Sequence, residues 1–304
     1  MINGLSILIP AFETDIRQLV NDLSQQAQDF GCPFEIIVRE DGQHSYLEKN
    51  AEILTIPYVK HIKAKHVGRA KGRNELAKMA QHHWLLFLDA DSEITSKNYL
   101  KNWIPFFKTN QLTSGGRIYA PEMPKEIAFQ LHWKWGTARE LVDENKRNTM
   151  PENCFLSNNF VVEKQVIQRI PFNENLVGYG YEDTLFAFDL KENGILIHHT
   201  QNPVVHLGLD DTHALLQKIE EAMQNLLKIK KMYASNNQTL PLKSKLIGLL
   251  IWLRFYTVRQ ILIAAHENVK SQLLKPNPSL FWFDLYRLTT LSKLIQKDLK
   301  QTIF

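Results

Sequence analysis

The feature that most constrains the fold is an alternation of short apolar runs with helical segments in the first third of the chain. The apolar runs stand at residues 5–10, 34–38 and 84–88, and residues 58–62 are expected to form a further strand before the last of them. Each run is rich in Val, Ile, Leu or aromatic residues and ends at a turn, which predicts a buried strand. Residues 15–30 and 72–81, which lie between these runs, have helical spacing. Strands separated by helices are typical of a mainly parallel α/β sheet, and such sheets bind ligands beyond the carboxyl ends of their strands.

The rest of the chain continues the mixed pattern and then becomes helical. Strand character returns at residues 115–119 and 155–162, and a helix is expected over residues 127–143. The polar stretch of residues 145–153 is predicted to be a mobile loop. From Thr212 onward the spacing of apolar residues is almost entirely helical.

The length and composition fit one α/β domain with an appendage. The chain has 304 residues, of which 44% are hydrophobic, enough for a full core. We therefore expect a domain over residues 1–210 and a helical C-terminal extension over residues 211–304. The formal net charge is only +4, which gives no indication of a nucleic-acid partner. The excess of basic residues is concentrated in the extension.

The cysteines and the N-terminal residues favour a cytoplasmic protein. Cys32 and Cys154 show neither metal-ligand spacing nor a disulfide framework. The N-terminus runs directly into the first predicted strand, without the features of a signal peptide. No apolar run reaches the ~20 residues that a membrane span needs.

One apolar stretch in the extension, residues 246–253, is accompanied by basic side chains. These are Lys243, Lys245, Arg254 and Arg259. A helix that is apolar nearly all round is usually buried, within the chain or in a homo-oligomer. Peripheral contact with the inner face of a membrane is the alternative, because anionic lipids attract basic segments.

Two carboxylates follow the fourth predicted strand. Asp89 and Asp91 flank Ala90 directly after the apolar run of residues 84–88. In an extended chain residues i and i+2 share a face, so both side chains can approach one divalent cation. Mn²⁺ or Mg²⁺ suits such an oxygen-rich site and can stabilise the charge on a leaving diphosphate. A solvated acidic turn is the alternative for so short a motif.

A basic, glycine-bearing segment leads into the helix before this strand. It runs from His66 to Ala77 and contains Gly68, Arg69 and Arg73. Helix N-termini and cationic side chains both favour phosphate groups, so this segment is expected to bind a diphosphate. An ordinary basic helix start is the alternative.

Four segments resemble family 2 glycosyltransferases in their order and spacing. They are residues 5–10, 38–42, 68–74 and 86–91. The resemblance implies the GT-A fold, a single Rossmann-like, mainly parallel sheet flanked by helices. It places Pro10, Ala11 and Glu13 at the nucleotide base, Asp41 on uracil or its ribose, and Arg73 and Asn74 near the donor. Residues 40–43 depart from the Asp-Asp-Gly-Ser turn common in the family.

A further resemblance lies in residues 178–184, which read Gly-Tyr-Gly-Tyr-Glu-Asp-Thr. This segment is similar to the Gly-Trp-Gly-Gly-Glu-Asp segment of related galactosyl- and hexosaminyltransferases and of polysaccharide polymerases. The resemblance implies that Asp183 is the general base and that Glu182 binds acceptor or donor hydroxyls. Gly180 and Tyr181 are expected to lie against a sugar. The alternative is that the acidic pair only caps the helix that follows.

The resemblance also implies a third metal ligand and an acceptor site. His206 corresponds to a histidine that completes the metal shell, although a lone histidine is more often structural. Asn158 and Asn159 are expected to contact the donor or the acceptor, or else merely to end a strand. Trp133 and Trp135 lie where the family builds its acceptor site. Their spacing puts them on different faces of a helix, so only one is expected to stack on a sugar.

Together these features predict an inverting, metal-dependent hexosyl- or hexosaminyltransferase. Asp183 would deprotonate a hydroxyl of a glycan or lipid-linked acceptor, which then attacks the sugar of a nucleotide-sugar donor, with UDP as the expected nucleotide. Synthesis of a surface polysaccharide is the expected setting. One alternative is a sugar-1-phosphate nucleotidyltransferase, although the chain lacks a Gly-rich loop after its first strand. The other is a non-catalytic protein that binds nucleotides or sugars.

Overall fold

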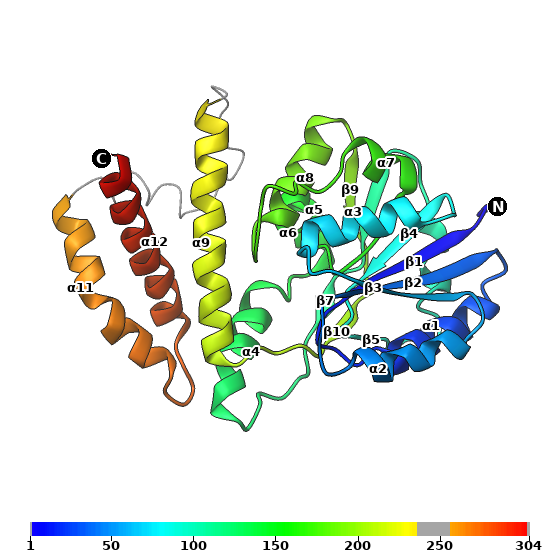
Figure 1. Cartoon of the computed structure of the whole chain (residues 1–304), viewed down its shortest axis with the longest axis horizontal. Coiled ribbons are helices and arrows are strands. Elements are labelled where there is room, and N and C mark those ends of the chain that lie inside the picture. The colour runs from blue at the N-terminus through cyan, green and yellow to red at the C-terminus, as the bar shows by residue number, and fades with distance from the viewer. Residues whose placement is uncertain (1, 236–255, 303–304) are drawn as a thin grey trace. The chain divides into compact units, whose positions relative to one another are not determined.

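Figure 1 shows the computed structural model of the chain, which describes residues 2–235 and 256–302. The chain forms two compact units. The first comprises Met1–Ala120, Glu140–Asn175 and Glu182–Gly208, and the second comprises Pro121–Arg139, Leu176–Tyr181 and Leu209–Phe304. Because the backbone passes between the units more than once, they do not correspond to one break in the sequence. The boundary expected at residue 210 stays a prediction.

The first unit is built on a seven-stranded sheet in the order β3-β2-β1-β4-β8-β6-β9. Its strands are β1 (Leu5–Ala11), β2 (Phe34–Asp41), β3 (Val59–Ala64), β4 (Trp84–Leu88), β6 (Gln111–Ser114), β8 (Asn159–Glu163) and β9 (Leu196–His199). Neighbouring strands are parallel except where β8 pairs with β4 and β6. The mainly parallel α/β sheet expected from the sequence is therefore confirmed.

The central strands are apolar on both faces because each face is covered. Ile7 and Ile9 of β1 belong to a core shared with α1 (Arg17–Gln28), whereas Leu8 packs in a second core with α3 (Arg69–Met79). In Figure 1, α1 and α2 (Leu47–Asn50) lie on one side of the sheet and α3 on the other. Fully burying one such side chain contributes about 1.5–3 kcal/mol. Burial on both faces explains why these strands read as continuous apolar runs.

The loop expected over residues 145–153 is wrong, because the structure has two short helices there. They are α5 (Glu144–Thr149) and α6 (Pro151–Cys154). Asp143 caps α5 by accepting a hydrogen bond from the Asn145 N–H at 2.9 Å. Pro151 opens α6, a position where its missing N–H costs nothing. Side-chain capping thus organises a polar stretch that has no apolar periodicity.

A second, three-stranded sheet gathers distant segments at the end of β4. Its strands are β5 (Ser92–Glu93), β10 (Val204–His206) and β7 (Arg117–Ile118), with β10 in the middle. His206 pairs with Ser92, and Val204 pairs with Arg117. The first unit also contains the helices α7 (Lys164–Arg169) and α8 (Glu182–Glu192).

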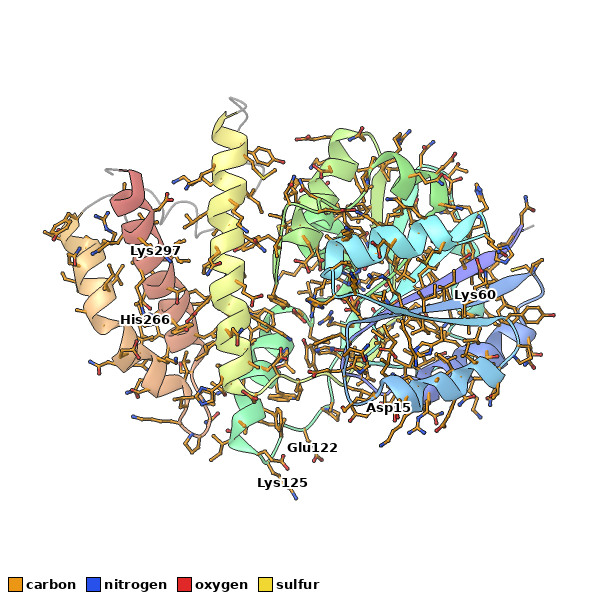
Figure 2. The ribbon with its side chains drawn as sticks, in the orientation of Figure 1. Asp15, Lys60, Glu122, Lys125, His266 and Lys297 are labelled. Carbon is orange, nitrogen blue, oxygen red and sulfur yellow. The ribbon has the colours of Figure 1, made fainter. Side chains whose placement is uncertain are left out.

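The second unit is helical over its described residues. Its helices are α4 (Ile127–Arg139), α9 (Thr212–Ser235), α11 (Tyr256–Leu273) and α12 (Leu280–Thr302). His266 of α11, labelled in Figure 2, lies 2.9 Å from the Thr289 hydroxyl and packs on Tyr286 of α12. A helical C-terminal part is therefore confirmed.

The apolar stretch of residues 246–253, with Lys243, Lys245 and Arg254, lies outside the described residues. Arg259 is described, and it is buried with its guanidinium 5.7 Å from the centre of the Tyr256 ring. Among the helices that the structure describes, none is long and apolar enough to cross a membrane.

Candidate active site

Asp89 lies at the carboxyl end of β4, where two arginines neutralise it. Its backbone N–H donates to the Asn158 carbonyl at 2.8 Å, which fixes the turn after the strand. Arg73 Nη2, from α3, donates to Asp89 Oδ1 at 2.7 Å. Arg117 Nη2, from β7, lies 3.9 Å from the other carboxylate oxygen. Asp89 therefore holds two guanidinium groups together at this edge of the sheet.

One carboxylate oxygen of Asp91 accepts no hydrogen bond from any described residue. Oδ2 lies 3.4 Å from His206 Nδ1, whereas Oδ1 is buried and has no hydrogen-bond partner among the described residues. Burial alone would raise the pKa of this carboxyl, but His206, followed by Arg117 and Arg69, holds the pKa well below its usual range. The group is therefore ionised at neutral pH. A buried, unpaired carboxylate oxygen fits a divalent cation, which would compensate its charge.

The cation site that these residues offer is only partial. Within residues 2–235 and 256–302, no group of three His, Cys, Asp or Glu side chains has the arrangement of a metal site. Asp91 and His206 could supply two ligands, since carboxylates suit Mn²⁺ and Mg²⁺ and imidazole suits transition-metal cations. The remaining positions would have to be filled by groups from outside this set.

Arg117 is a site residue that the sequence analysis did not single out. Its Nη1 lies 3.1 Å from Glu140 Oε2, which also accepts a hydrogen bond from the Tyr119 hydroxyl. Burial would lower the pKa of Arg117, but Glu140 and the nearby aspartates hold it above its ordinary value. The charge is therefore permanent. Only the Gly-Gly turn before this residue could have drawn attention to it, and that signal is weak.

Gly208 allows the chain to pass against the Asp91 carboxylate. A Cβ atom at this position would lie 2.1 Å from Asp91 Oδ2, far inside van der Waals contact. The Leu207 N–H also donates to the Asp91 carbonyl at 2.8 Å. The position of the carboxylate thus depends on a glycine far away in the sequence.

We expect Gly208→Ala to displace the Asp91 carboxylate and to weaken donor binding about tenfold or more, since misplacement of one site group by about 1 Å has effects of this size or larger. Isothermal titration with a sugar nucleotide and Mn²⁺ would measure it. Gly72→Ala is the matched control, because its Cβ would meet only Arg39 Nη1, at an ordinary 3.7 Å. Equal affinities in both variants would contradict the expectation.

The acidic pair of residues 182–183 opens α8. Asp183 accepts hydrogen bonds from the Ser157 N–H at 3.1 Å and from the Ser157 hydroxyl at 2.8 Å. Glu182 is buried, and burial together with the charge of Asp183 raises its pKa, against the opposing effect of Arg69 and Arg73. The structure thus brings Glu182 into the field of the arginines beside Asp89. The assignment of Asp183 as the base stays a prediction.

Asp41 and Asn74 have structural partners in the first unit. Asp41 accepts hydrogen bonds from the N–H groups of Val67 and Gly68 at 2.9 and 3.2 Å. It therefore ties the end of β2 to the start of α3. Asn74 exchanges two hydrogen bonds with the backbone of Phe172, at 2.9 and 3.0 Å. These contacts do not test whether either residue also reaches a donor.

The residues expected at the nucleotide base lie at or just after the end of β1. Pro10 and Ala11 are its last residues, and Ala11 is buried. Glu13 is exposed and has a left-handed backbone, with φ at 49°. Such a conformation is uncommon for a residue with a side chain and is found often at functional sites. Their contact with a nucleotide stays a prediction.

Asn158 and Asn159 differ in what their amides do. Asn159 is fully buried and donates to the carbonyls of Gly116 and Asn202, while it accepts a hydrogen bond from the Tyr99 hydroxyl. It therefore joins three parts of the first unit. Asn158 is also buried, but its Oδ1 has no hydrogen-bond partner among the described residues. Of the two, Asn158 is the one whose side chain remains available to a ligand.

The glycines of the segment from residue 178 to 180 pack against α9 in the second unit. A Cβ on Gly180 would lie 2.5 Å from the Ala222 Cβ, and one on Gly178 would lie 2.8 Å from Glu221. Both glycines also have positive φ angles. The close approach that requires glycine at both positions is thus to a helix, and contact of this segment with a sugar stays a prediction. Tyr181 follows with φ at 69°, a strained value for tyrosine.

The two tryptophans of α4 lie in the second unit. Trp135 packs on Phe283 of α12, with ring centres 6.1 Å apart, and on His132, 5.8 Å away. It is therefore part of the helix packing. Trp133 is partly buried, and its contact with a sugar stays a prediction.

The sequence matches the profile of Glycosyl transferase family 2 over residues 6–166, more than half of the chain. The chain belongs to this family. The match confirms the resemblance seen in the first half of the sequence. It includes Arg73, Asp89 and Asp91 and ends before Glu182, Asp183 and His206. A comparison with curated proteins finds no sequence match.

Solved structures of glycosyltransferases share the fold of this family 2 protein. Mannosyltransferase PcManGT from Pyrobaculum calidifontis, in complex with GDP-Man and Mn²⁺, has a TM-score of 0.51 at 12% identity, over 75% of this chain and 64% of that one. S. aureus TarS has a TM-score of 0.50 at 15% identity, over 95% of this chain and 55% of that one. This chain therefore spans less than two thirds of either protein.

A third structure is glucosyl-3-phosphoglycerate synthase from Mycobacterium tuberculosis, in complex with Mn²⁺, UDP and phosphoglyceric acid. It has a TM-score of 0.51 at 16% identity, over 73% of this chain and 78% of that one. At these identities the likeness shows the fold alone. It confirms the predicted GT-A fold.

Proposed function

We propose that this family 2 glycosyltransferase moves a hexosyl or hexosaminyl group from a nucleotide-sugar, with UDP as the nucleotide, to an acceptor hydroxyl with inversion. The observation that carries the proposal is the state of Asp91, which is half-buried and ionised and has one buried oxygen without a hydrogen-bond partner among the described residues. Two arginines, Arg73 and Arg117, lie next to the neighbouring Asp89. Arg69 is close enough to lower the pKa of Asp91. Cations next to an anionic metal ligand suit a metal-bound diphosphate.

The proposal includes Mn²⁺ or Mg²⁺ as the cofactor. Asp91 would hold it, with His206 as a second ligand and Asp89 in a supporting position. When bound, such a cation stabilises the negative charge that develops on the departing diphosphate. Cations of this class commonly keep water and substrate phosphate oxygens in their shell, which suits a site with two protein ligands. PcManGT and the mycobacterial synthase, which share the fold, contain Mn²⁺ with GDP-Man and with UDP, respectively.

The chain's own residues would divide the remaining work between donor and acceptor. On the donor side, we propose that the base and ribose are bound by Pro10, Ala11, Glu13 and Asp41, and the diphosphate and sugar by Gly68, Arg69, Arg73, Asn74 and Ala90. Asp183 would take the proton of the acceptor hydroxyl, since a carboxylate fixed by two hydrogen bonds is well oriented for proton transfer. Glu182 would bind a hydroxyl of the donor or the acceptor.

The acceptor would be a glycan or a lipid-linked glycan in the synthesis of a surface polysaccharide. Asn158 is the residue of the first unit proposed to bind it, within a catalytic domain of residues 1–210. A cytoplasmic location at the inner face of a membrane, reached through the C-terminal extension of residues 211–304, would bring the enzyme to such a lipid. The resemblance of residues 178–184 to related transferases supports this choice.

Release of nucleoside diphosphate from a panel of UDP- and GDP-sugars tests the proposal. We expect release from one or a few donors in the presence of Mn²⁺, and a decrease of about 100-fold or more with EDTA, because the cation stabilises the leaving group by several kcal/mol. Activity that EDTA does not lower would contradict the role of the metal. Release of pyrophosphate from a nucleoside triphosphate and a sugar 1-phosphate would instead identify a nucleotidyltransferase.

A further inference from the structure

A small cavity in the first unit is lined in part by Arg117, which also lies near Asp89. Its volume is about 140 Å³, and its wall includes Ile118, Glu140, Arg147, Leu156 and Gln201 besides Arg117 itself. Arg117 also lies 3.9 Å from Asp89, so one guanidinium borders both the cavity and the proposed donor site. Neither the sequence motifs nor the proposed transfer reaction accounts for this cavity.

Arg147 gives the cavity a buried positive charge that the chain does not pair. The residue is 5% exposed, and its Nη2 donates to the Thr200 carbonyl at 2.9 Å. Among the ion pairs of the described residues none includes Arg147, and its buried Nε has no hydrogen-bond partner there. Burial lowers the pKa of its guanidinium, and the nearest carboxylates, Glu144 and Asp143, counteract this only at longer range. Buried charges without a counter-ion are unfavourable and are usually paired.

The other polar groups near Arg147 do not neutralise it. Arg147 Nη1 lies 3.3 Å from His199 Nδ1, and burial lowers the pKa of this histidine to about 4, so the imidazole is neutral. Two carboxylates also line the cavity, Glu140 and Asp143. Glu140 is engaged with Arg117 and Tyr119, and Asp143 accepts the Asn145 N–H, so neither forms an ion pair with Arg147. The Nε of Arg117, like that of Arg147, is buried without a hydrogen-bond partner among the described residues. Of the two guanidinium groups on the wall, Arg117 is paired with Glu140, whereas that of Arg147 has no ion pair among the described residues.

We propose that this cavity binds the phosphate or carboxylate group of a small anionic molecule, held by Arg147 and Arg117. Guanidinium groups are the preferred partners of both anions, because their fork of donors matches the oxygen geometry. At about 30 Å³ per water the cavity holds about five waters, which is room for a phosphate or carboxylate group and one or two carbon atoms. Ile118 and Leu156 provide apolar contacts for its carbon atoms. Use of the cavity as a subsite for an anionic acceptor rests on the proposed function, whereas anion binding does not.

Binding of inorganic phosphate and of glycerol phosphate to the full chain tests the proposal, by titration calorimetry at constant ionic strength. Gln201→Glu places a carboxylate on the cavity wall at an exposed position that tolerates it. We expect this variant and Arg147→Gln to bind about tenfold more weakly or worse, because like charges in a binding site repel the ligand. Arg139→Gln, which removes an equally charged but half-exposed side chain, controls for net charge and should bind as the unmodified protein does.

Arg73→Gln separates this cavity from the proposed donor site, where phosphate could also bind. Affinity that survives Arg73→Gln and is lost in Gln201→Glu supports the proposal. Absence of binding at about 10 mM phosphate, a ligand range that would detect even weak sites, or affinity that depends on Arg73 and not on Gln201→Glu, overturns it. Should Arg147→Gln fail to fold, Gln201→Glu decides alone.

The two ligands identify the source of the anion. Tighter binding of glycerol phosphate, by about tenfold, would indicate a phosphate carried on a larger molecule, whereas equal affinities would indicate the free ion. Both results support the anion site. A protein that binds phosphate here but releases no nucleoside diphosphate from any donor would contradict the proposed function and leave the cavity's role intact. An active enzyme that does not bind phosphate would support the proposed function and contradict the anion site.

Discussion

Asp91→Ala should lower the rate of sugar transfer by about 10³-fold, because it removes the ligand whose cation stabilises the leaving diphosphate by several kcal/mol. Metal-dependent binding of the sugar nucleotide should be lost with it. The fold should survive, since the Asp91 side chain is partly exposed and lies in no apolar core. Steady-state kinetics, calorimetry with and without Mn²⁺, and circular dichroism would measure the three effects.

Asp91→Asn is the control for the shape of the side chain. It keeps the volume and one carbonyl oxygen but loses the charge, so its turnover should also fall strongly. His206→Ala should have a smaller effect than either variant, because a substrate or water oxygen can replace one of several ligands. Unchanged turnover in Asp91→Ala would remove the centre of the proposed mechanism.

Asp183→Asn should lower kcat by roughly 10²-fold or more while donor affinity stays the same. The amide keeps the size of the side chain and one acceptor for the Ser157 hydrogen bonds, but it cannot take a proton. Steady-state kinetics would give kcat, and calorimetry would give the Kd of the donor. The two measurements together separate a loss of chemistry from a loss of binding.

Glu182→Gln is the matched comparison, because Glu182 and Asp183 both lie in the first turn of α8. Glu182 is buried, with Arg69 and Arg73 near enough to act on its pKa. With Asp183 as the proposed base, loss of Glu182 should affect binding of substrate hydroxyls more than proton transfer. If Glu182→Gln were inactive and Asp183→Asn active, the base would have been assigned to the wrong member of the pair.

The parallel sheet could be predicted because its signal is local in the sequence. β1 and β4 are continuous apolar runs, and the helices beside them show their apolar faces within a few turns. Asp89 and Asp91 could be found for the same reason, since they directly follow such a run. Local order also places Arg73 on α3, whose contact with Asp89 follows from the parallel arrangement of the neighbouring strands.

The rest depends on contacts that no short pattern encodes. Arg117 reaches the site through β7, a strand of two residues, and its orientation depends on Glu140. The need for glycine at Gly208 is visible only when the Asp91 carboxylate is in place. Likewise, glycine is required at Gly178 and Gly180 because α9, which comes later in the chain, passes close to both positions. Each of these features depends on a contact between two segments that are far apart in the sequence.

The three-stranded sheet makes the site sensitive to the order in which the chain is synthesised. The strands that surround Asp91 are β5, β7 and β10, and β10 leaves the ribosome last. A nascent chain that has emerged only through β4 can already pair its first four parallel strands, because their contacts need no later residue. It has Asp89 and Arg73, but neither His206 nor Gly208. A ribosome-stalled chain ending before Val204 should therefore contain the sheet and lack part of the proposed cation site, so that metal binding there would mark the completion of the first unit during translation.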